Sequence, residues 1–513
     1  MPISSRFKSH LERALWIGIG VGVLAFLSGC ARLAEQPEVN PDAWAPASAE
    51  RIWTPSPASA SDYRMPNGLR PSPGPAAPSA SPSRQDPVLQ QAPGHQQDQP
   101  YDLPALLDLA LGENPDTRVA WESARQAAAN FGAARAPYYP LVSANSVNGY
   151  TRTLFPLPKG GAAQYKLWQA QPLVQVTYTL LDFGRRSSSA EAARQTLAAA
   201  NFSFDRRMQD VVFAVQRAYY ALCAAKAAVT AARQNLELAQ SDFDAAHQRL
   251  NLGLATEPAL LLTKERVAQS QYDVANAELM VHDAQASLTA AIGIPANQPM
   301  EVASLETLPV PTVLDGQIDE MIAATIKQRP DLAAKVAGLR ASEARVALAK
   351  AAWYPTVDLT ANYGQLIWRY TFGGPPNAWA NQPQYSSLVT LQWDVFTGLK
   401  RLNDVRAAEA EDAATRAGVK SAEIGAIAEM WRAYYEFQSS LKKYAFGQAL
   451  LAAAQESYNA NIETYRQGLS TIVELLTAER DLANARYTLI QSRADLLTSY
   501  AAVAYAAGAV RMP

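Results

Sequence analysis

The chain carries one long-range repeat, and this repeat limits what it can fold into. The matched segments lie 215 residues apart (329 minus 114 for the first): Asn114-Pro115-Asp116 with Arg329-Pro330-Asp331, Tyr139-Pro140 with Tyr354-Pro355, Arg217-Ala218-Tyr219-Tyr220 with Arg432-Ala433-Tyr434-Tyr435, Gly253-Leu254-Ala255-Thr256 with Gly468-Leu469-Ser470-Thr471, and Tyr272 with Tyr487. Solenoids and propellers repeat every 20 to 50 residues or so, which is much shorter. The sequence therefore predicts one elaborate block at 101–300, duplicated at 301–510, with pseudo-symmetry between the copies.

The first residues have the pattern of a targeting segment. Basic residues precede an apolar run, Ala14–Leu27, which is shorter than the roughly 20 residues that a membrane-spanning helix needs. The run ends in Leu27-Ser28-Gly29-Cys30, which resembles a bacterial lipobox. We expect a lipoprotein signal peptide at 1–29, with diacylglycerol and palmitate attached to Cys30. Ala31 follows, and in Gram-negative lipoproteins a residue other than Asp there usually implies the outer membrane. The alternative is an ordinary signal peptide with an incidental Cys.

The segment that follows, 30–100, has the composition of a tether. Residues 31–100 hold 14 of the 33 prolines of the chain, mixed with Ala, Ser and Gln. Such a segment cannot bury enough apolar surface to offset the entropy of ordering it. We therefore expect a tether between the lipid and the folded body, and the sequence leaves open whether part of it packs as an extended strap.

Four stretches carry a heptad pattern typical of long coiled-coil helices. Steps of three and four residues from Met208 to Leu250 meet only apolar side chains, with no Pro between them. The same spacing recurs, with more polar residues, over 430–465, 260–288 and 475–503. The sequence predicts a helix from Arg185 to Leu250, roughly 100 Å long at about 1.5 Å per residue. The seam over 430–465 carries Tyr444, Tyr458, Asn461 and Tyr465, so the second hairpin is the better candidate for movement.

Between the helices, each copy has two segments in which apolar and polar residues alternate. Val357, Leu359, Ala361 and Tyr363 share one face, for example, and Val174, Val176, Tyr178 and Leu180 share another. We expect four strands of about 10 residues, with aromatic residues near their ends, as in membrane barrels. A soluble sandwich with one polar face is the alternative. Because four strands cannot close a barrel and eight leave its interior filled, a pore needs three or more copies of the chain, hence 12 strands.

The duplicated order of helix, strand pair, long helix, Gly-x-x-Thr turn and returning helix resembles the TolC-like outer-membrane efflux channels. Further residues that carry the resemblance are Asp182-Phe183-Gly184-Arg185, Tyr465-Arg466-Gln467-Gly468 and Leu475-Leu476-Thr477-Ala478. The lipobox places the chain near the lipoprotein branch, which is OprM- and NodT-like. The resemblance implies a homotrimer with a 12-stranded transmembrane β-barrel and a periplasmic α-barrel of long coiled-coil hairpins. It also implies a periplasmic adaptor protein and an inner-membrane pump of the RND type as partners.

The resemblance assigns roles to the two turns. Contact with the adaptor falls on Gly253, Leu254, Thr256, Gly468, Leu469 and Thr471. The periplasmic gate falls on Tyr465, Ser470, Val473, Glu474 and Thr477, where three copies of Glu474 would form a cation-favouring ring of carboxylates. The alternative for Glu474 is a solvated acid at a helix start, favourable to the helix dipole. Relatives often carry an acid at the position of Thr477 or an Arg near Ser470. This chain has neither, which weakens the expected ring of carboxylates and the salt bridge that would lock the gate.

The residues give no support for an enzyme. The chain has four histidines, no phosphate-binding Gly-rich loop, no metal-ligand cluster and no nucleophile motif. Cys223 lies on an apolar helical pattern, so we expect a buried thiol and no disulfide framework. A formal net charge of −2 argues against nucleic acid as a partner. We expect efflux of organic toxic compounds, with metal efflux, type I protein secretion and a lipid-anchored periplasmic scaffold without a pore as the alternatives.

Overall fold

The computed structural model describes residues 44–54, 101–158, 160–298, 300–311, 318–372 and 378–509. Cys30, the signal peptide and most of the tether lie outside these residues. The chain divides into two compact units. We call the one with 123–200 and 337–419 the sheet unit, and the one with 48–122, 201–336 and 420–509 the hairpin unit.

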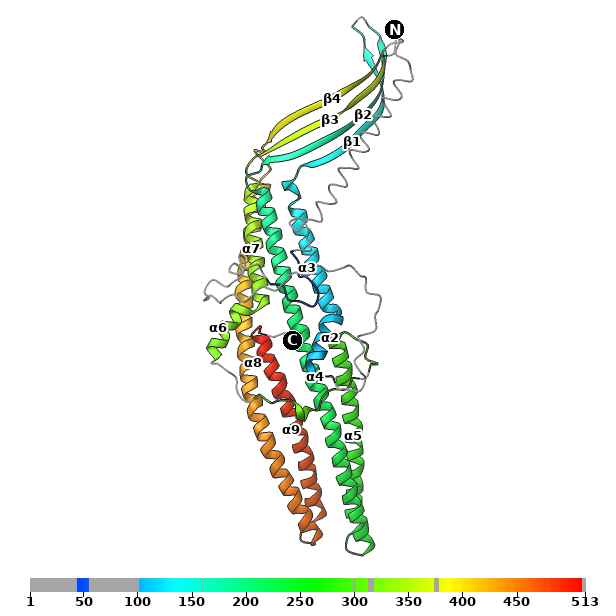
Figure 1. Ribbon diagram of the computed structural model, residues 1–513, viewed down its shortest axis with the longest axis vertical. Helices are drawn as coiled ribbons and strands as arrows, with labels where there is room; N and C mark the ends of the chain where they lie inside the picture. Colours follow the sequence, from blue (N-terminus) through cyan, green and yellow to red (C-terminus); the bar gives the residue numbers. More distant parts are fainter. Residues whose placement is uncertain are drawn as a thin grey trace. The chain divides into compact units, whose positions relative to one another are not determined.

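The sheet unit is built on one antiparallel sheet in the order β1-β2-β3-β4 (Figure 1). Its strands are β1 (Leu141–Pro156), β2 (Ala162–Leu181), β3 (Thr356–Phe372) and β4 (Ala378–Gln392). They contain 16, 20, 17 and 15 residues, so the predicted length of about 10 is wrong. In the half of β2 that the prediction left out, polar residues and Pro172 interrupt the alternation. The hydrogen-bonded ladder between β2 and β1 nevertheless continues through this half. Gly364 of β3 lies directly against the backbone of Pro172, where a side chain would not fit.

The helices repeat as the sequence predicts. The first copy has α2 (Leu103–Glu113), α3 (Pro115–Ala134), α4 (Arg185–Asn251) and α5 (Glu257–Ile292); the second has α6 (Ile318–Gln328), α7 (Pro330–Ala351), α8 (Lys400–Arg466) and α9 (Ile472–Ala506). Each helix of the second copy begins 215 residues after its counterpart, as β3 does after β1. Both α4 and α8 contain 67 residues, which confirms the predicted long helix. Within the described residues, no helix combines the length and apolarity needed to cross a membrane.

The heptad seams form the core of the long hairpins. Every residue of the four predicted series is buried or half-buried, from Met208 and Leu222 on α4 to Leu482 on α9. In the hairpin unit, one apolar cluster around Tyr458, Leu475 and Leu482 also contacts residues of α4 and α5. The two hairpins of this unit therefore share a core.

The repeated Asn-Pro-Asp and Arg-Pro-Asp motifs hold the ends of the returning helices. Asn114 is buried, and its amide donates a hydrogen bond of 2.7 Å to the carbonyl of Ala291 in the last turn of α5. Gly293 ends that helix at φ +95°, and a Cβ there would lie 2.7 Å from Pro115. In the second copy Gly508 approaches Arg329 in the same way. In each copy the motif therefore packs closely against the glycine that ends the returning helix.

Gly293→Ala is expected to destabilise the hairpin unit by several kcal/mol, because the new methyl group meets both strained backbone and the atoms of Asn114 and Pro115. Gly253→Ala is the matched control, since Gly253 also has a positive φ but no atom lies within 4 Å of its Cβ position. We expect the control to cost only about 1–2 kcal/mol. Thermal unfolding of both variants measures the difference, and equal losses would show that the close approach does not matter.

Part of the tether packs as a strap. In the sheet unit, the ring of Trp44 lies 4.8 Å from that of Phe131, edge to face. In the hairpin unit, Trp53 makes the same kind of contact with Phe202 at 5.0 Å, and its backbone N–H donates a 2.7 Å hydrogen bond to Asp205. Burial raises the pKa of Asp205 to about 8. These contacts fix residues 44–54 on the folded chain.

Candidate functional site

The sheet has one apolar and one polar face over the halves of the strands that adjoin the helices. On the apolar face Val174, Val176 and Tyr178 of β2 pair with Tyr363, Ala361 and Leu359 of β3. On the polar face Gln175, Thr177 and Thr179 pair with Asn362, Thr360 and Asp358. The predicted alternation is therefore confirmed by the register. A sheet with these two faces can separate lipid from a water-filled space.

The two turns of the hairpins have the conformations that their glycines predict. Gly253 and Gly468 have φ values of +76° and +78°, which favour glycine. The leucines that follow them are exposed, Leu254 at 66% and Leu469 at 76%. Each turn therefore presents a solvent-exposed apolar side chain beside a helix start.

The helix starts after the two turns are capped differently. The hydroxyl of Thr471 accepts a hydrogen bond from the N–H of Glu474, and the Glu474 carboxylate accepts one of 2.8 Å from the N–H of Thr471. This reciprocal capping box stabilises the start of α9. Thr256 makes no such side-chain bond. Pro258, in the first turn of α5, has no N–H to offer.

The predicted gate residues do not share one environment. Tyr465 is buried and Ser470 is half-buried, and the hydroxyl of Ser470 accepts a hydrogen bond of 3.1 Å from Thr464. Val473, Glu474 and Thr477 are all exposed. The side chain of Glu474 bonds to Thr471 at the start of α9, which is the helix-start role named as the alternative. Its carboxylate remains accessible to solvent.

Three arginines join the first hairpin to the second, and none was singled out from the sequence. Arg249 of α4 donates a hydrogen bond of 2.8 Å to the carbonyl of Tyr465, and its guanidinium lies 4.6 Å from the centre of the Tyr465 ring. Arg266 of α5 forms an ion pair of 3.0 Å with Glu479 of α9. Arg486 of α9 donates to Asn235 of α4 at 2.7 Å. These contacts hold the hairpins together near their turns.

Two buried carboxylates lie within this set of contacts. The side chain of Glu479 is 1% exposed and depends on Arg266 as its partner. Asp242 of α4 is also buried, and burial together with the charge of Glu479 raises its pKa to about 6. Burial likewise raises the pKa of Glu479, although Arg266 opposes the shift. The junction of the hairpins is therefore sensitive to both the charge of Arg266 and the proton of Asp242.

The sequence carries a signal that the first turns of α5 and α9 attract each other, but none for the pair Arg266–Glu479 itself. At repeat-equivalent positions the first copy reads Lys264-Glu265-Arg266 and the second reads Glu479-Arg480-Asp481, so every charge is reversed. The reversed charges indicate that these stretches of α5 and α9 attract each other. They do not indicate the pair itself, since the repeat counterpart of Arg266 is Asp481 and its partner is Glu479. Asp242 and Arg249 have no comparable signal, because their counterparts in the second copy are Ser457 and Thr464.

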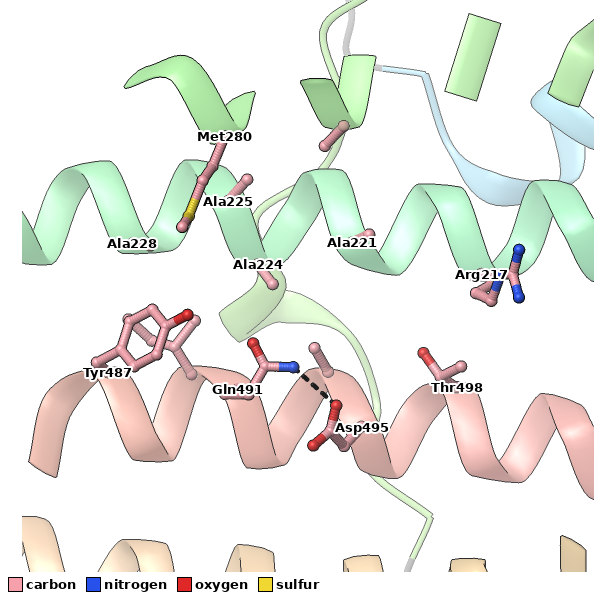
Figure 2. Close-up of a pocket in the computed structure, with 13 residues that line it drawn as sticks. Arg217, Ala221, Ala224, Ala225, Ala228, Met280, Tyr487, Gln491, Asp495 and Thr498 are labelled. Atoms are coloured by element: carbon pink, nitrogen blue, oxygen red, sulfur yellow. Dashed lines mark hydrogen bonds between the residues drawn. The ribbon is translucent and has the colours of Figure 1, made fainter. Parts of the chain in front are cut away.

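A groove in the hairpin unit lies among α4, α5 and α9 (Figure 2). It encloses about 360 Å³, and its α4 side is made of Arg217 and four alanines, Ala221, Ala224, Ala225 and Ala228. Figure 2 shows Tyr487, Gln491, Asp495 and Thr498 on the α9 side, with Gln491 donating a 2.8 Å hydrogen bond to Asp495. Alanines make up most of its α4 side, so the groove has the character of a packing surface.

The described residues include no group of three or more His, Cys, Asp or Glu side chains placed to hold a metal ion. Cys223 is a free, buried thiol, as predicted, and its sulfur donates a hydrogen bond to the carbonyl of Ala303 at 3.3 Å. Burial raises the pKa of this thiol to about 11, which keeps it protonated and unreactive at neutral pH.

Comparison with known proteins gives a consistent answer. Residues 106–294 and 321–509 both match the family model described as outer membrane efflux protein. The chain is 27% identical over 407 residues to Protein CyaE of Bordetella pertussis, covering 78% of this chain and 83% of that protein. It is 26% identical over 455 residues to the probable efflux pump outer membrane protein TtgC of Pseudomonas putida, covering 85% and 89%.

Solved structures agree in fold. The outer-membrane channel OprN superimposes with a TM-score of 0.68 at 20% identity, over 80% of this chain and 91% of that one. The open state of the MtrE outer membrane channel of Neisseria gonorrhoeae gives a TM-score of 0.65 at 20% identity, over 84% and 98%.

Proposed function

Because this chain belongs to the outer membrane efflux protein family, whose members are outer-membrane channels, we propose that three copies form one continuous conduit. Each copy contributes four strands to a 12-stranded barrel and two hairpins to a helical barrel. The observation that carries the proposal is the register of the sheet, which puts apolar side chains on one face and polar side chains on the other. The apolar face meets lipid and the polar face lines the water-filled lumen.

The exposed leucines at the two turns support docking of a periplasmic adaptor at this end of the hairpins. Leu254 and Leu469 are exposed at the two turns, each held on a rigid helix end. Apolar side chains of this kind, beside polar helix starts, suit a protein partner that covers them. The adaptor would connect the channel to an inner-membrane pump of the RND type.

Lipid attachment would anchor the N-terminus in the outer membrane. The support is the lipobox at Leu27–Cys30 and the strap at 44–54, which begins close behind it. Cys30→Ser is expected to abolish acylation while the trimer still forms, because the strap contacts do not involve the lipid. Incorporation of labelled palmitate tests this: label still entering the substituted protein would contradict it.

The carboxylates of Glu474 would form the acidic ring at the periplasmic aperture. Their exposure supports this role, since an exposed acid near a constriction attracts cations. Glu474→Gln is expected to reduce the cation preference of the channel in planar bilayers. Glu257→Gln, at the start of the first-copy hairpin α5, is the matched control and is expected to leave selectivity unchanged. Unchanged selectivity in Glu474→Gln would leave Glu474 with its capping role alone.

We propose organic toxic compounds as the substrates. Relatives differ in this respect, since one is named a toluene efflux pump protein of Pseudomonas putida and another a cation efflux system protein of Escherichia coli. Deletion of the gene and complementation with the intact chain test the proposal against a panel of organic compounds, metal salts and secreted proteins. Loss of resistance to organic compounds is the expected result. A change confined to metal tolerance or to protein secretion would contradict it.

A further inference from the structure

Three basic residues gather on the apolar face of the sheet, near the end of the strands that is remote from the helices. Arg152 of β1 and Lys166 of β2 are direct cross-strand partners. Arg369 of β3 pairs with Trp168, two residues further along β2 on the same face. The end concerned is the one at which β1 turns into β2 and β3 turns into β4. We call Arg152, Lys166 and Arg369 the basic cluster.

The basic cluster has no counter-charge within the part of the chain that the structure describes. Like charges directly opposite each other on neighbouring strands destabilise a sheet. No ion pair or side-chain hydrogen bond joins any of the three residues to another described residue. The four strands contain a single acid, Asp358, and it lies on the polar face near the helix end. An anion from outside the chain would relieve this repulsion.

The neighbours of the basic cluster indicate where that anion sits. Tyr150, Trp168, Arg369 and Trp379 are successive cross-strand partners and form one row across all four strands. From this row to the helix ends, the apolar face carries no charged side chain on any of the strands. On β2 this uncharged band runs from Ala170 to Leu180, about 33 Å along the strand and about 25 Å across a bilayer at the usual tilt. Its height matches the apolar band of a membrane barrel.

An aromatic row at the edge of such a band marks the membrane–water interface. The basic cluster therefore lies at the level of lipid head groups, with the uncharged band beneath it for acyl chains. Arginine and lysine at this level bind phosphate by charge-assisted hydrogen bonds. Free phosphate would use only the cations, whereas a phosphorylated lipid uses the cations, the aromatic row and the band together.

We infer that the basic cluster binds the phosphate groups of a glycolipid in the outer leaflet, the lipid A part of lipopolysaccharide. The inference rests on the proposed function for its orientation, which puts the strand hairpins at the cell exterior. It adds a site for one specific lipid to the face that the proposed function already turns toward the membrane, and it explains why three cations are tolerated beside an apolar band.

The test uses the full-length chain and the triple variant Arg152→Gln/Lys166→Gln/Arg369→Gln. Purified protein is titrated with lipid A, with dephosphorylated lipid A, with phosphatidylglycerol and with inorganic phosphate, and bound lipid is counted by native mass spectrometry. Arg432→Gln/Lys442→Gln/Lys443→Gln is the matched control, because it removes the same charge from exposed positions of α8. We expect lipid A to bind the triple variant at least about tenfold more weakly than the parent and the control. Dephosphorylated lipid A is expected to bind all three proteins alike.

Equal binding of lipid A to the parent and the triple variant would overturn the inference, as would equal affinity for phosphatidylglycerol or saturation by inorganic phosphate alone. If the triple variant fails to fold, Arg152→Gln/Lys166→Gln is measured in the same way and is expected to lose severalfold in affinity. Conductance of the parent in planar bilayers separates the two proposals. A conducting parent with unaltered lipid A binding in the variant refutes the lipid site alone, whereas a parent without conductance refutes the proposed function.

Discussion

Arg266→Ala is expected to separate the two hairpins near their turns. The substitution leaves the Glu479 carboxylate, which is 1% exposed, without its cationic partner. Removing one member of a buried ion pair costs about 3–5 kcal/mol, because the other charge stays in a poorly solvated place. Hydrogen exchange of the amides around 475–485 of α9 is the direct readout, since local opening exposes them. We expect their protection to fall by at least about a hundredfold.

Two further variants serve as controls for this result. Arg233→Ala breaks an ion pair of 2.8 Å with Glu278 whose members are 65% and 47% exposed, and such a pair contributes about 0–1 kcal/mol. Arg266→Met/Glu479→Leu removes both buried charges and is expected to recover most of the protection. Similar protection in Arg266→Ala and Arg233→Ala would show that the buried pair does not hold the hairpins together.

Mild acid is expected to tighten the same junction through Asp242. The pKa of Asp242 is raised to about 6 by burial and by the charge of Glu479, above its value of about 3.9 in an unfolded chain. A raised pKa means that the folded junction binds the proton more tightly. The stability that this proton provides is therefore complete below about pH 4 and is lost as the pH rises through about 6. The difference amounts to about 3 kcal/mol between the two limits.

Asp242→Asn should remove this dependence, because the amide is neutral at every pH and has nearly the same shape. The parent is expected to exchange the amides of the junction faster at pH 7.5 than at pH 5, after correction for intrinsic rates. The variant should show the slow exchange at both values. Faster exchange of the parent at pH 5 would mean that the sign of the pKa shift is wrong, and that Arg466 outweighs burial at this carboxylate.

The order and starts of the elements could be predicted because their signals occur twice. The Asn-Pro-Asp and Arg-Pro-Asp motifs, the Gly-Leu turns and the heptad seams recur at one spacing, so each copy supports the assignment in the other. Strand length could not be predicted in the same way. The halves of β1 to β4 that are remote from the helices do not alternate regularly, and pairing with the neighbouring strand extends them beyond the visible pattern.

The contacts between hairpins were harder to predict for a physical reason. A heptad seam tells which face of a helix is buried, but not which residue of a second hairpin lies opposite a given position. Arg249 therefore could not be assigned to Tyr465, and Asp242 looked like any polar residue of a helix. The reversed charges at 264–266 and 479–481 indicate that these two stretches attract each other once the repeat is aligned. They match Arg266 with Asp481, however, so the pairing with Glu479 could not be predicted from them.

Single-channel conductance tests most directly the central claim that this chain forms a channel. It also tests the prediction that the contacts between its hairpins narrow the periplasmic aperture. Purified trimers of the parent and of Arg249→Ala/Arg266→Ala are inserted into planar bilayers under identical salt. The double variant loses the hydrogen bond to Tyr465 and the ion pair to Glu479 together. We expect small conductance steps for the parent and steps severalfold larger for the variant. Absence of conductance in the parent would contradict the claim of a channel, and equal conductance in the two proteins would contradict the role of these contacts in narrowing it.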